Sequence, residues 1–506
     1  MTLPDWLQPL PGAEQMRAMD RWAIEERRIP SLDLMERAGA GIALLADRTV
    51  PRGPVAIVCG KGNNGGDGFV AARLLYELGR TVRVLRLAEP MEYRGDAAEN
   101  LRRLEGHHEP FSLAGLDGAT VVVDAIFGTG FDGEPRGLAK DAIEAIAALE
   151  VPVVAADIAS GVDASTGEAA AVSVWATATG TFAAAKPGHW IAPGKQHSGK
   201  LEVIDIGIPP DAPVQADVGL LTARVHAIVP RREAAGTKFT SGHVVVAGGS
   251  RGLTGAPGLA SEAAMRSGAG YVTTLVPASL EPIFEMRLLE VMTRGLPDAD
   301  GALRADGVDA ALAAAERAGA LVAGPGAGRS DGAFEFVREL AARAPVALLL
   351  DADGLNAHAG ALDRLAERSA PTILTPHAGE LGRLLERSSA EIERRRLRSA
   401  REAAQRANAV VVLKGDDTIV AAPDGTAAVN GLSSPALATA GTGDVLSGVI
   451  GALLAKRLEP FAAACAGVRR HAAAGRVAAH EHGADGVIAS DVIAALPRAA
   501  SGEPEQ

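Results

Sequence analysis

A chain of 506 residues exceeds the size at which one hydrophobic core stops growing, so we expect two domains. Its composition, with 47% apolar residues, only 3% aromatic residues and 59 glycines, is typical of alanine- and valine-rich α/β layers and argues against an aromatic-packed β-sandwich. The formal net charge of −12 argues against non-specific nucleic-acid binding, and the two cysteines, Cys59 and Cys465, form neither a disulfide framework nor a C-x-x-C metal site.

The first residues carry no basic-then-apolar run of the kind found in signal peptides, and no apolar run along the chain approaches membrane-spanning length. We therefore expect a cytoplasmic protein with no membrane partner.

Two helices are predicted near the N-terminus. Ala13 to Arg28 has apolar residues at helical spacing, and Leu32 to Leu45 follows Pro30-Ser31 as a second helix.

A strand, a glycine-rich loop and a helix come next. Pro54 to Cys59 is a short apolar strand, residues 60–68 read Gly-Lys-Gly-Asn-Asn-Gly-Gly-Asp-Gly, and a helix is predicted from Phe69 to Leu78. Such a loop exposes backbone amides at a helix N-terminus, although it is not the G-x-G-x-x-G fingerprint. Its asparagine and aspartate oxygens suit a hard cation or ribose hydroxyls as well as a phosphate. A left-handed turn built for geometry alone explains one asparagine, but explains two asparagines and an aspartate poorly.

Two further strands each end in polar groups. A strand from Thr120 to Asp124 is followed by the glycine-containing residues 125–134, and a strand from Val151 to Ala156 is followed by Asp157 to Gly161. The carboxyl ends of parallel strands meet at one edge of a sheet, where ligands bind. Turn capping is the more common explanation for any one of these acids, but three strand ends with carboxylate or hydroxyl groups together indicate a binding edge.

Nearly all of residues 10–220 resembles the NAD(P)H-hydrate epimerases. The likeness lies in residues 63–68, 124–134 and 157–161 and in Ala185-Lys186-Pro187-Gly188, whereas Ala159 stands where a proline is usual. The resemblance implies a Rossmann-like, three-layer domain that binds hydrated NADH or NADPH, with Asp157 as an acid/base group. It also implies a potassium ion (K⁺) held near Asn64, Asp124 and Ser160. The implied substrate-binding residues are Asn63, Asn64, Gly65, Gly66, Asp67, Gly128, Thr129, Gly130, Phe131, Asp132, Gly133, Glu134 and Asp157.

A linker is predicted from Ile204 to Val218, because Pro209-Pro210 and small polar residues interrupt the alternation of strands and helices there. We place the domains at residues 1–221 and 222–506.

The second half repeats the pattern of strands that end in polar or glycine-rich turns. These turns are Gly248 to Ala256, Gly324 to Gly328, Asp351 to Asn356, Thr375 to Glu380 and Lys414 to Thr418. A lone histidine in a turn is more often structural than functional, but His377 lies at the edge already used by Asp351 and Gly326, which favours a binding role. Lys414 is either a solvated surface charge or a contact to a nucleotide phosphate.

The stretch from Ala438 to Gly448, Ala-Thr-Ala-Gly-Thr-Gly-Asp-Val-Leu-Ser-Gly, is predicted to be a glycine-rich turn that opens a buried helix. Gly441 and Gly443 allow the backbone to approach a ligand, and the unpaired amides of the helix N-terminus attract a phosphate. Asp444 is placed to take a proton from a hydroxyl, although it could serve only as an N-cap. The small residues Ser447, Gly448, Gly451, Ala452 and Ala455 form one face that predicts close packing against a neighbour.

This stretch resembles the anion hole of ribokinase-like kinases, and residues 225–497 resemble the ADP-dependent NAD(P)H-hydrate dehydratases. The resemblance implies a ribokinase-like α/β domain in which Asp444 deprotonates the substrate hydroxyl, ADP is the co-substrate and Mg²⁺ screens the diphosphate. The implied nucleotide-binding residues are Lys414, Gly415, Asp416, Asp417, Thr418, Gly441, Thr442 and Gly443, and those for the hydrate are Ala256, Gly326, His377 and Asp444.

The chemistry explains why two such activities would share a chain. Water added across the C5–C6 bond of a reduced nicotinamide gives two C6 epimers, and a dehydratase specific for one needs an epimerase to rescue the other. We expect small-molecule substrates and a homo-oligomer. The sequence leaves open the preference between ADP and ATP, the preference between hydrated NADH and NADPH, the size of the oligomer, and channelling between the sites.

Two alternatives are kept. The second half could be a small-molecule kinase that stops at the phosphorylated product, and the first half could be a module that binds a ligand or partner without turnover. The presence of Asp157 together with Asp124 and Asn64 speaks against such a module.

Overall fold

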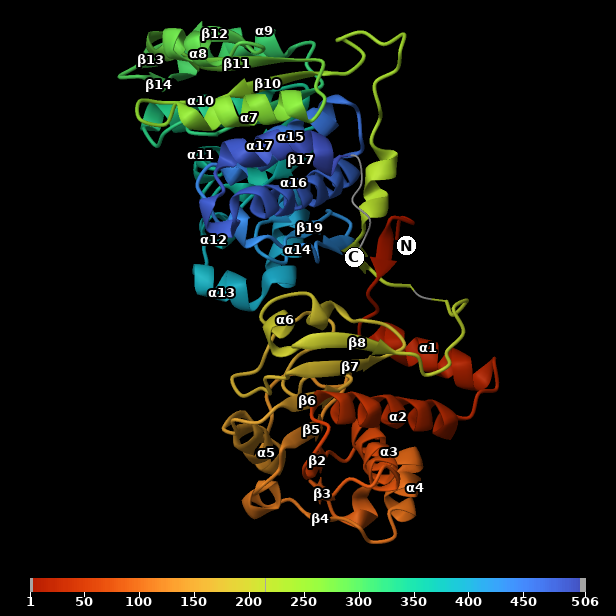
Figure 1. Ribbon diagram of the computed structural model, residues 1–506. Coiled ribbons are helices and arrows are strands. Elements are labelled where there is room, and N and C mark those ends of the chain that lie inside the picture. Colours follow the sequence, from red (N-terminus) through yellow and green to blue (C-terminus); the bar gives the residue numbers. More distant parts are fainter. Residues whose placement is uncertain (1–2, 214, 501–506) are drawn as a thin grey trace. The chain divides into compact units, whose positions relative to one another are not determined.

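The computed structural model describes residues 3–213 and 215–500, and its contacts divide the chain into two compact units (Figure 1). The first unit is Pro9–Val218, and the second takes the chain from Gly219 onward together with Pro4–Gln8. The domain limits of 1–221 and 222–506 stay a prediction. Among the described residues, no helix has both the length and the apolar character needed to cross a membrane.

The first unit is built on a seven-stranded sheet. Its strands are β2 (Val55–Cys59), β3 (Val82–Arg86), β4 (Glu109–Pro110), β5 (Val121–Ala125), β6 (Val153–Ala156), β7 (Ala178–Phe182) and β8 (Lys200–Ile204). Its helices are α1 (Ala13–Glu25), α2 (Ser31–Thr49), α3 (Asn63–Glu77), α4 (Gly95–Arg103), α5 (Gly137–Ala147) and α6 (Gly194–His197), with 3₁₀ turns η1 (Pro90–Glu92), η2 (Leu113–Leu116) and η3 (Pro187–His189).

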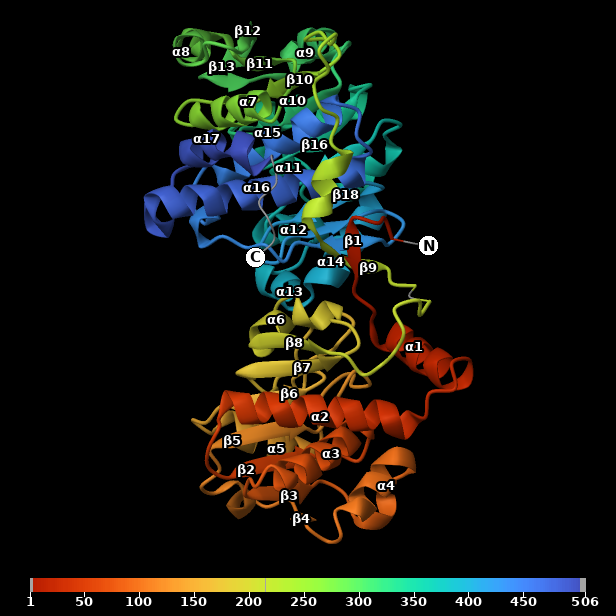
Figure 2. The same cartoon turned by 45° about the vertical axis from the view of Figure 1, so that its right-hand side comes forward.

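Apolar residues cover both faces of this sheet. Ile57 and Val123 belong to a core with α2 and α3, whereas their neighbours Val58 and Val122 belong to a second core with α5. Because successive side chains of a strand point to opposite faces, an unbroken apolar strand needs a helix layer on each side. The predicted three-layer arrangement is confirmed; α2 lies along one face of the sheet in Figure 2.

The strand order places a ligand-binding crevice in the first unit. All pairings in the order β4-β3-β2-β5-β6-β7-β8 are parallel, so the chain builds outward from β2 through β3 and β4, then returns to β5 and builds in the other direction. The switch point between β2 and β5 leaves a crevice at the carboxyl ends of these two strands.

The second unit is built on an eleven-stranded sheet. Its strands are β1 (Leu7–Pro9), β9 (Val218–Leu221), β10 (His243–Ala247), β11 (Tyr271–Pro277), β12 (Met292–Leu296), β15 (Ala320–Ala323), β16 (Ala347–Leu350), β17 (Thr372–Leu374), β18 (Val410–Leu413), β19 (Ile419–Ala421) and β20 (Ala427–Val429), beside a small hairpin of β13 (Asp298–Ala299) and β14 (Ala302–Leu303). Its helices are α7 (Gly255–Arg266), α8 (Glu281–Arg287), α9 (Val308–Ala315), α10 (Asp331–Arg343), α11 (Asp353–Asn356), α12 (Ala378–Leu385), α13 (Ser389–Arg394), α14 (Arg396–Ala407), α15 (Thr442–Ala455), α16 (Pro460–His482) and α17 (Ala489–Ala499). The 3₁₀ turns are η4 (Ala223–Ile228), η5 (Ala278–Leu280), η6 (Ala305–Gly307), η7 (Leu362–Glu367), η8 (Pro435–Leu437) and η9 (Ala484–Gly486).

A second switch point lies between β10 and β15. The chain builds from β10 to β11 and β12 on one side and from β15 through β16 and β17 to β18 on the other, always in parallel, before β19 and β20 add antiparallel strands. The glycine-rich turns after β10 and β15 therefore flank a second crevice.

The predicted helix after Gly441 is confirmed as α15, and its small-residue face packs as expected. Gly448 lies so close to α7 that a side chain there would collide with the carbonyl oxygen of Ala260, and Gly451 lies against Val322. Helices α7, α15, α16 and α17 lie together (Figures 1 and 2). Close contact with α7 fixes where the N-terminus of α15 lies at the crevice.

One predicted element boundary is wrong. The residues expected to form a loop, 60–68, contain the start of α3, which begins at Asn63 and not at Phe69. The glycines allow close packing: a side chain at Gly65 would collide with the carbonyl oxygen of Gly60, and one at Gly68 would lie 2.8 Å from the Sγ atom of Cys59. The first turn of the helix is thereby held directly against the strands.

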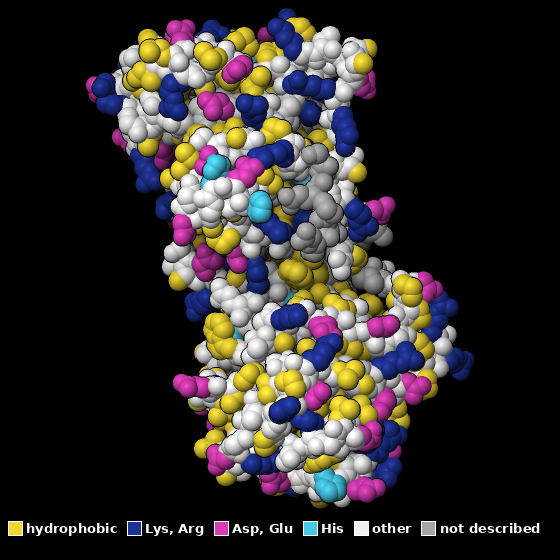
Figure 3. Space-filling view, viewed as in Figure 1, with side chains coloured by type: hydrophobic (Ala, Val, Ile, Leu, Met, Phe, Trp, Pro, Cys, Tyr) yellow, Lys and Arg dark blue, Asp and Glu magenta, His cyan; other side chains and the backbone are white. Residues whose placement is uncertain are grey.

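Charged side chains of both signs are mixed over the face drawn in Figure 3. Among the coloured residues, Lys and Arg alternate with Asp and Glu and do not gather into one basic stripe.

Candidate active sites

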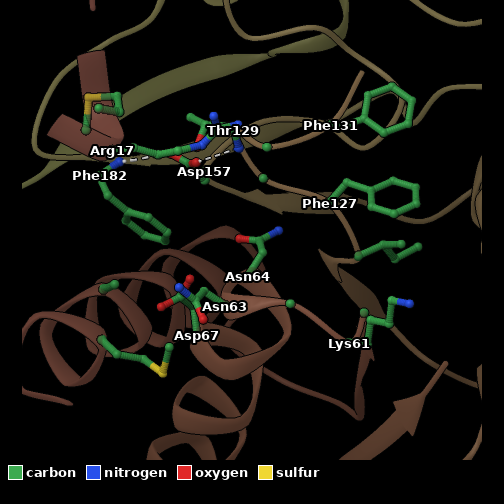
Figure 4. Close-up of a pocket in the computed structure, with 18 of the residues that line it drawn as sticks. Arg17, Lys61, Asn63, Asn64, Asp67, Phe127, Thr129, Phe131, Asp157 and Phe182 are labelled. Atoms are coloured by element: carbon green, nitrogen blue, oxygen red, sulfur yellow. Dashed lines mark hydrogen bonds between the residues drawn. The ribbon is translucent and has the colours of Figure 1, made fainter. Parts of the chain in front are cut away.

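A cavity of about 1180 Å³ opens at the switch point of the first unit. It is lined by the residues that follow β2, by the loop that follows β5, by the end of β6 and by part of α1. Figure 4 shows Asp157 and Thr129 on one side of the cavity and Asn64 and Asp67 of α3 on the other. The cavity is large enough for a dinucleotide fragment and carries both amide and carboxylate groups.

The predicted substrate-binding residues of the first unit converge on this cavity with two exceptions. The lining includes Asn63, Asn64, Asp67, Asp157 and the whole segment from Gly128 to Glu134. Gly65 and Gly66 do not line it, because they face the Gly60 carbonyl and the Met35 side chain. Phe127 and Phe131 stack with ring centroids 4.8 Å apart at one side of the cavity (Figure 4).

Asp157 is buried in a left-handed backbone conformation with φ of 68°, which costs energy outside glycine and is often found at functional sites. Its carboxylate forms an ion pair with the Lys186 ammonium at 2.6 Å and accepts hydrogen bonds from the Thr129 amide at 3.1 Å and the Thr181 hydroxyl at 3.2 Å. Burial opposes ionisation, but the Lys186 ammonium and the Thr129 amide, with His189, together outweigh it, and the pKa of Asp157 lies below its ordinary value. Asp157 is therefore ionised.

Lys186 has no exposed surface and is fixed by three acceptors. Besides Asp157, its ammonium donates to the Thr181 hydroxyl at 2.7 Å and to the Phe182 carbonyl at 3.0 Å. Its backbone amide donates to Nδ1 of His189, whose Nε2 then donates to the Asp157 carbonyl at 2.9 Å. Burial lowers the pKa of His189 to about 4, so this ring is neutral. The network holds Asp157 rigidly at the cavity wall.

The three residues implied for potassium offer oxygen donors. Asp124 and Ser160 are buried together, with the Ser160 hydroxyl donating to the Asp124 carboxylate at 2.6 Å. Burial raises the pKa of Asp124 to about 6. Asn64 is 8% exposed and both atoms of its amide lack a hydrogen-bond partner. A buried oxygen without a partner is what a hard monovalent cation would satisfy, and Asp124 and Ser160 are oxygen donors of the same kind, so the chemistry of these residues fits the ion.

In the second unit, Ala256 and Gly326 meet at the switch point. Gly326 has a positive φ of 61°, and a side chain there would lie 3.2 Å from the Cβ atom of Ala256. The Ser250 hydroxyl donates to the Gly326 carbonyl at 2.9 Å and ties the two turns together. The structure thus brings these two predicted hydrate-binding residues side by side.

Asp444 lies in the first turn of α15, three residues after the N-cap Gly441, whose φ is 90°. Among the described residues, no side chain or amide donates a hydrogen bond to the Asp444 carboxylate. Burial and then the negative charge of Asp351 raise the pKa of Asp444 to about 7. It is therefore poised to gain or lose a proton near neutral pH.

Lys414 reaches this turn from the end of β18. Its ammonium pairs with Asp351 at 2.9 Å and lies 3.8 Å from Glu380, and a side chain at Gly443 would lie 3.5 Å from it. Asp351 also accepts from the Ser447 hydroxyl at 2.7 Å. The lysine thus lies beside the proposed phosphate turn, within reach of a nucleotide phosphate.

The rest of the predicted nucleotide loop, Gly415 to Thr418, forms a closed turn in which the Thr418 hydroxyl donates to the Gly415 carbonyl at 2.7 Å. Asp417 is buried and paired with Arg396 at 2.9 Å, and Arg396 also donates to the Lys414 carbonyl at 3.2 Å. The Asp417 carboxylate therefore fixes the shape of the loop.

His377 is the N-cap of α12. Its Nδ1 accepts from the Gly379 and Glu380 amides, and Glu380 returns a hydrogen bond to the His377 amide at 2.9 Å. The side chain is 55% exposed with Nε2 3.6 Å from Glu380. The structure gives His377 a capping role and leaves its Nε2 edge accessible.

Sequence reasoning did not assign a role to several residues that shape these sites. Lys186 and Arg396 each make a buried ion pair with a residue far along the chain. No local pattern marks such residues. Lys186 could have been found from the quoted Ala-Lys-Pro-Gly run, which places a lysine after the strand next to that of Asp157.

Family models match both units. The model described as NAD(P)H-hydrate dehydratase matches residues 244–498, and the model described as YjeF-related protein N-terminus matches residues 31–188. These ranges include the Asp444 and Asp157 sites, respectively.

Full-length relatives share both halves. The chain is 41% identical to the bifunctional NAD(P)H-hydrate repair enzyme of Moorella thermoacetica, over 96% of this chain and 95% of that protein, and 38% identical to the enzyme of the same description from Salinibacter ruber, over 97% and 96%. A solved structure of the ADP/ATP-dependent NAD(P)H-hydrate dehydratase from Bacillus subtilis is 30% identical, covers 54% of this chain and 94% of that one, and has a TM-score of 0.46.

Proposed function

The chain belongs to the family of bifunctional NAD(P)H-hydrate repair enzymes, and we propose that it returns hydrated NADH and NADPH to their active forms in two steps. The first unit interconverts the R and S epimers of the hydrate. The second unit dehydrates the S epimer with ADP and yields AMP and phosphate.

Epimerisation is proposed for the cavity of the first unit. Asn63, Asn64, Asp67 and the segment from Gly128 to Glu134 would bind the hydrated dinucleotide. The ionised Asp157, held by Lys186, would face the reacting ring and stabilise positive charge that develops on it. A potassium ion bound by Asn64, Asp124 and Ser160 would supply a fixed positive charge near the start of α3 that attracts anionic groups of the substrate.

Dehydration is proposed for the crevice of the second unit, where the hydrate would lie against Ala256, Gly326 and His377. Asp444 would take the proton of the C6 hydroxyl, whose oxygen then attacks the β-phosphorus of ADP, so that the bond to AMP breaks. The C6 oxygen then leaves as phosphate with electrons from the ring nitrogen, and loss of a proton from C5 to water returns those electrons to nitrogen and forms the C5=C6 double bond of NADH or NADPH. The amides at Gly441, Thr442 and Gly443, together with Lys414, would stabilise the moving phosphoryl charge.

Magnesium would supply charge screening on the diphosphate. Among the described residues there is no group of three His, Cys, Asp or Glu side chains arranged to hold a metal. Magnesium in nucleotide sites is held by phosphates and one or two carboxylates, so such an ion fits a site where Asp351, Asp353 and Glu380 act on Asp444 without forming a metal cluster of their own.

The observation that carries this proposal is the unpaired Asp444 carboxylate at the start of α15. It combines a pKa of about 7 with the amides of a helix N-terminus, which is what proton removal coupled to phosphoryl transfer requires.

The test is absorbance at 340 nm after purified protein is added to a mixture of both NADPH-hydrate epimers with ADP and magnesium. Recovery beyond the share of one epimer, with release of inorganic phosphate, is expected. Recovery limited to one epimer would refute the epimerase assignment, and a stable phosphoester without recovery would refute dehydration in favour of a small-molecule kinase.

A further inference from the structure

Two buried carboxylates face the cavity of the first unit from opposite sides. Asp157 comes from the end of β6 and Asp67 from α3, and each is 6% exposed (Figure 4). Both line the same cavity, so a ligand in it can contact both. Carboxylates that share a site take different roles when their surroundings separate their proton affinities.

The surroundings of these two groups are opposite. Asp157 is surrounded by donors: the Lys186 ammonium, the Thr129 amide and the Thr181 hydroxyl. No described residue donates a hydrogen bond to the Asp67 carboxyl. Burial, followed by the negative charges of Asp157, Asp20 and Asp96, raises the pKa of Asp67 well above its ordinary value, and the opposing effect of Lys186 is smaller.

Lys186 explains why the two acids differ. Its ammonium is held by Asp157, Thr181 and the Phe182 carbonyl, so it has no hydrogen left for another acceptor. Asp67 must then face the charge of Asp157 across the cavity without a cation of its own. One of two carboxylates in such a site keeps its proton.

We propose that Asp67 is the acid that protonates the leaving hydroxyl during epimerisation, while Asp157 stays ionised and stabilises the cationic ring. This assignment rests on the proposed epimerase function and deepens it. Asp67 gives its proton to the C6 hydroxyl, the C6–O bond breaks and water leaves. The lone pair of the ring nitrogen forms the N1=C6 double bond.

The planar C6 atom of that iminium can take up water on either face. When water adds on the other face, the new C–O bond forms, the electrons of the double bond return to nitrogen, and the excess proton of the added water goes to the Asp67 carboxylate. Every proton is accounted for and no redox partner is needed. The negative charge of Asp157 lowers the energy of the iminium without changing its own protonation.

The test uses the full chain and the purified R epimer of hydrated NADPH without ADP, so that the dehydratase is silent. Appearance of the S epimer is followed by chromatography. Asp67→Asn keeps the shape and a hydrogen-bonding group but loses the transferable proton, so we expect kcat for exchange to fall by about 100-fold or more with a smaller change in KM. Asp20→Asn is the competing variant, because Asp20 also lines the cavity and also has a raised pKa from burial.

The outcomes separate this inference from the proposed function. Wild-type protein that exchanges no epimers refutes the epimerase assignment itself. Wild-type exchange that is retained in Asp67→Asn, or lost in Asp20→Asn instead, overturns only the role of Asp67. If Asp67→Asn melts early by circular dichroism, Asp67→Glu decides: it keeps the acid and is expected to exchange at least about tenfold faster than Asp67→Asn, and equal rates overturn the role.

Discussion

Asp444 is expected to set a pH limit on dehydration, and Asp351 is expected to set where that limit lies. Burial and the charge of Asp351 raise the pKa of Asp444 to about 7, while Lys414 acts in the opposite direction. A carboxylate that accepts a proton from a hydroxyl works only when it is ionised. The rate of ADP-dependent dehydration should therefore rise as the pH passes through about 7.

The size of the effect follows from that pKa. Roughly one tenth of Asp444 is ionised at pH 6 and roughly nine tenths at pH 8, so kcat for dehydration should rise about tenfold between them.

The same pKa shift of Asp444 costs stability. Its folded-state pKa lies above the ordinary 3.8, so the free energy of unfolding falls as the pH rises from about 4 to about 7. About three units correspond to ~4 kcal/mol. Asp444→Asn should thus abolish dehydration and raise the free energy of unfolding at pH 8 by up to ~4 kcal/mol.

Asp351→Asn tests the cause. It removes the carboxylate whose negative charge raises the pKa of Asp444 the most, and it releases Lys414 from its ion pair. Both changes lower the pKa of Asp444. The midpoint of the pH profile should fall by about one unit or more. Asp353→Asn is the matched control, because Asp353 has a smaller effect on Asp444 and accepts hydrogen bonds from the Gly328 amide and from Arg329.

The assay is recovery of absorbance at 340 nm from the purified S epimer with saturating ADP and magnesium, from about pH 5.5 to about pH 8.5. A wild-type kcat that stays constant between about pH 6 and about pH 8 would refute the role of Asp444 as the base. A midpoint in Asp351→Asn equal to that of the wild type would refute the electrostatic explanation.

Three further predictions concern packing and charge. Lys186→Met should lower the free energy of unfolding by roughly 3–5 kcal/mol in urea titrations, because it leaves Asp157 buried without its cation. The double variant with Asp157→Asn should regain much of this stability. A double variant that is no more stable than Lys186→Met would contradict the ion-pair argument. Gly448→Ala should lower the free energy of unfolding by roughly 1–3 kcal/mol, because the added methyl group collides with the backbone of α7. Gly486 has open space around it, so Gly486→Ala should change the free energy of unfolding by less than about 0.5 kcal/mol. Equal changes in the two variants would contradict the packing argument. Epimer exchange should be faster with potassium than with lithium, and Asn64→Ala should remove that difference; a difference that survives the substitution would place the ion elsewhere.

The sequence was sufficient to predict elements whose signal lies within a few consecutive residues. Strand β5 is a run of valines that ends in Asp124, and β18 is a similar run followed by Lys414, so their ends could be predicted within a residue or two. The turn at Gly441 was also predictable, because two glycines and an aspartate before a small-residue helix have few other uses. Within each unit, parallel pairing places the carboxyl ends of the strands at one edge of that unit's sheet.

The start of α3 shows where local signals mislead. Asparagine and glycine have low helix propensity, so residues 63–68 were predicted to form a loop. The structure makes them the first turns of a helix, because Gly65 and Gly68 permit contact with β2 that a larger residue would prevent. The stability gained from this packing outweighs propensity, and no single-sequence pattern distinguishes a glycine chosen for packing from one chosen for a turn.

The two units have the same electrostatic arrangement. In each, a lysine that follows another strand of the same sheet pairs with one carboxylate, Lys186 with Asp157 and Lys414 with Asp351. A second carboxylate, from the N-terminal part of a helix, is left without a donor among the described residues. Burial then decides what that second acid can do. Asp67 is almost wholly enclosed and keeps its proton, which suits an acid, whereas Asp444 is partly exposed and titrates near neutrality, which suits a base. Removal of the lysine should act in the opposite direction to removal of its paired acid. Lys414→Met should raise the midpoint of the dehydration profile, whereas Asp351→Asn should lower it, because Lys414 is the cation that lowers the pKa of Asp444. A midpoint that moves downward in Lys414→Met would show that the paired lysine does not control the unpaired acid.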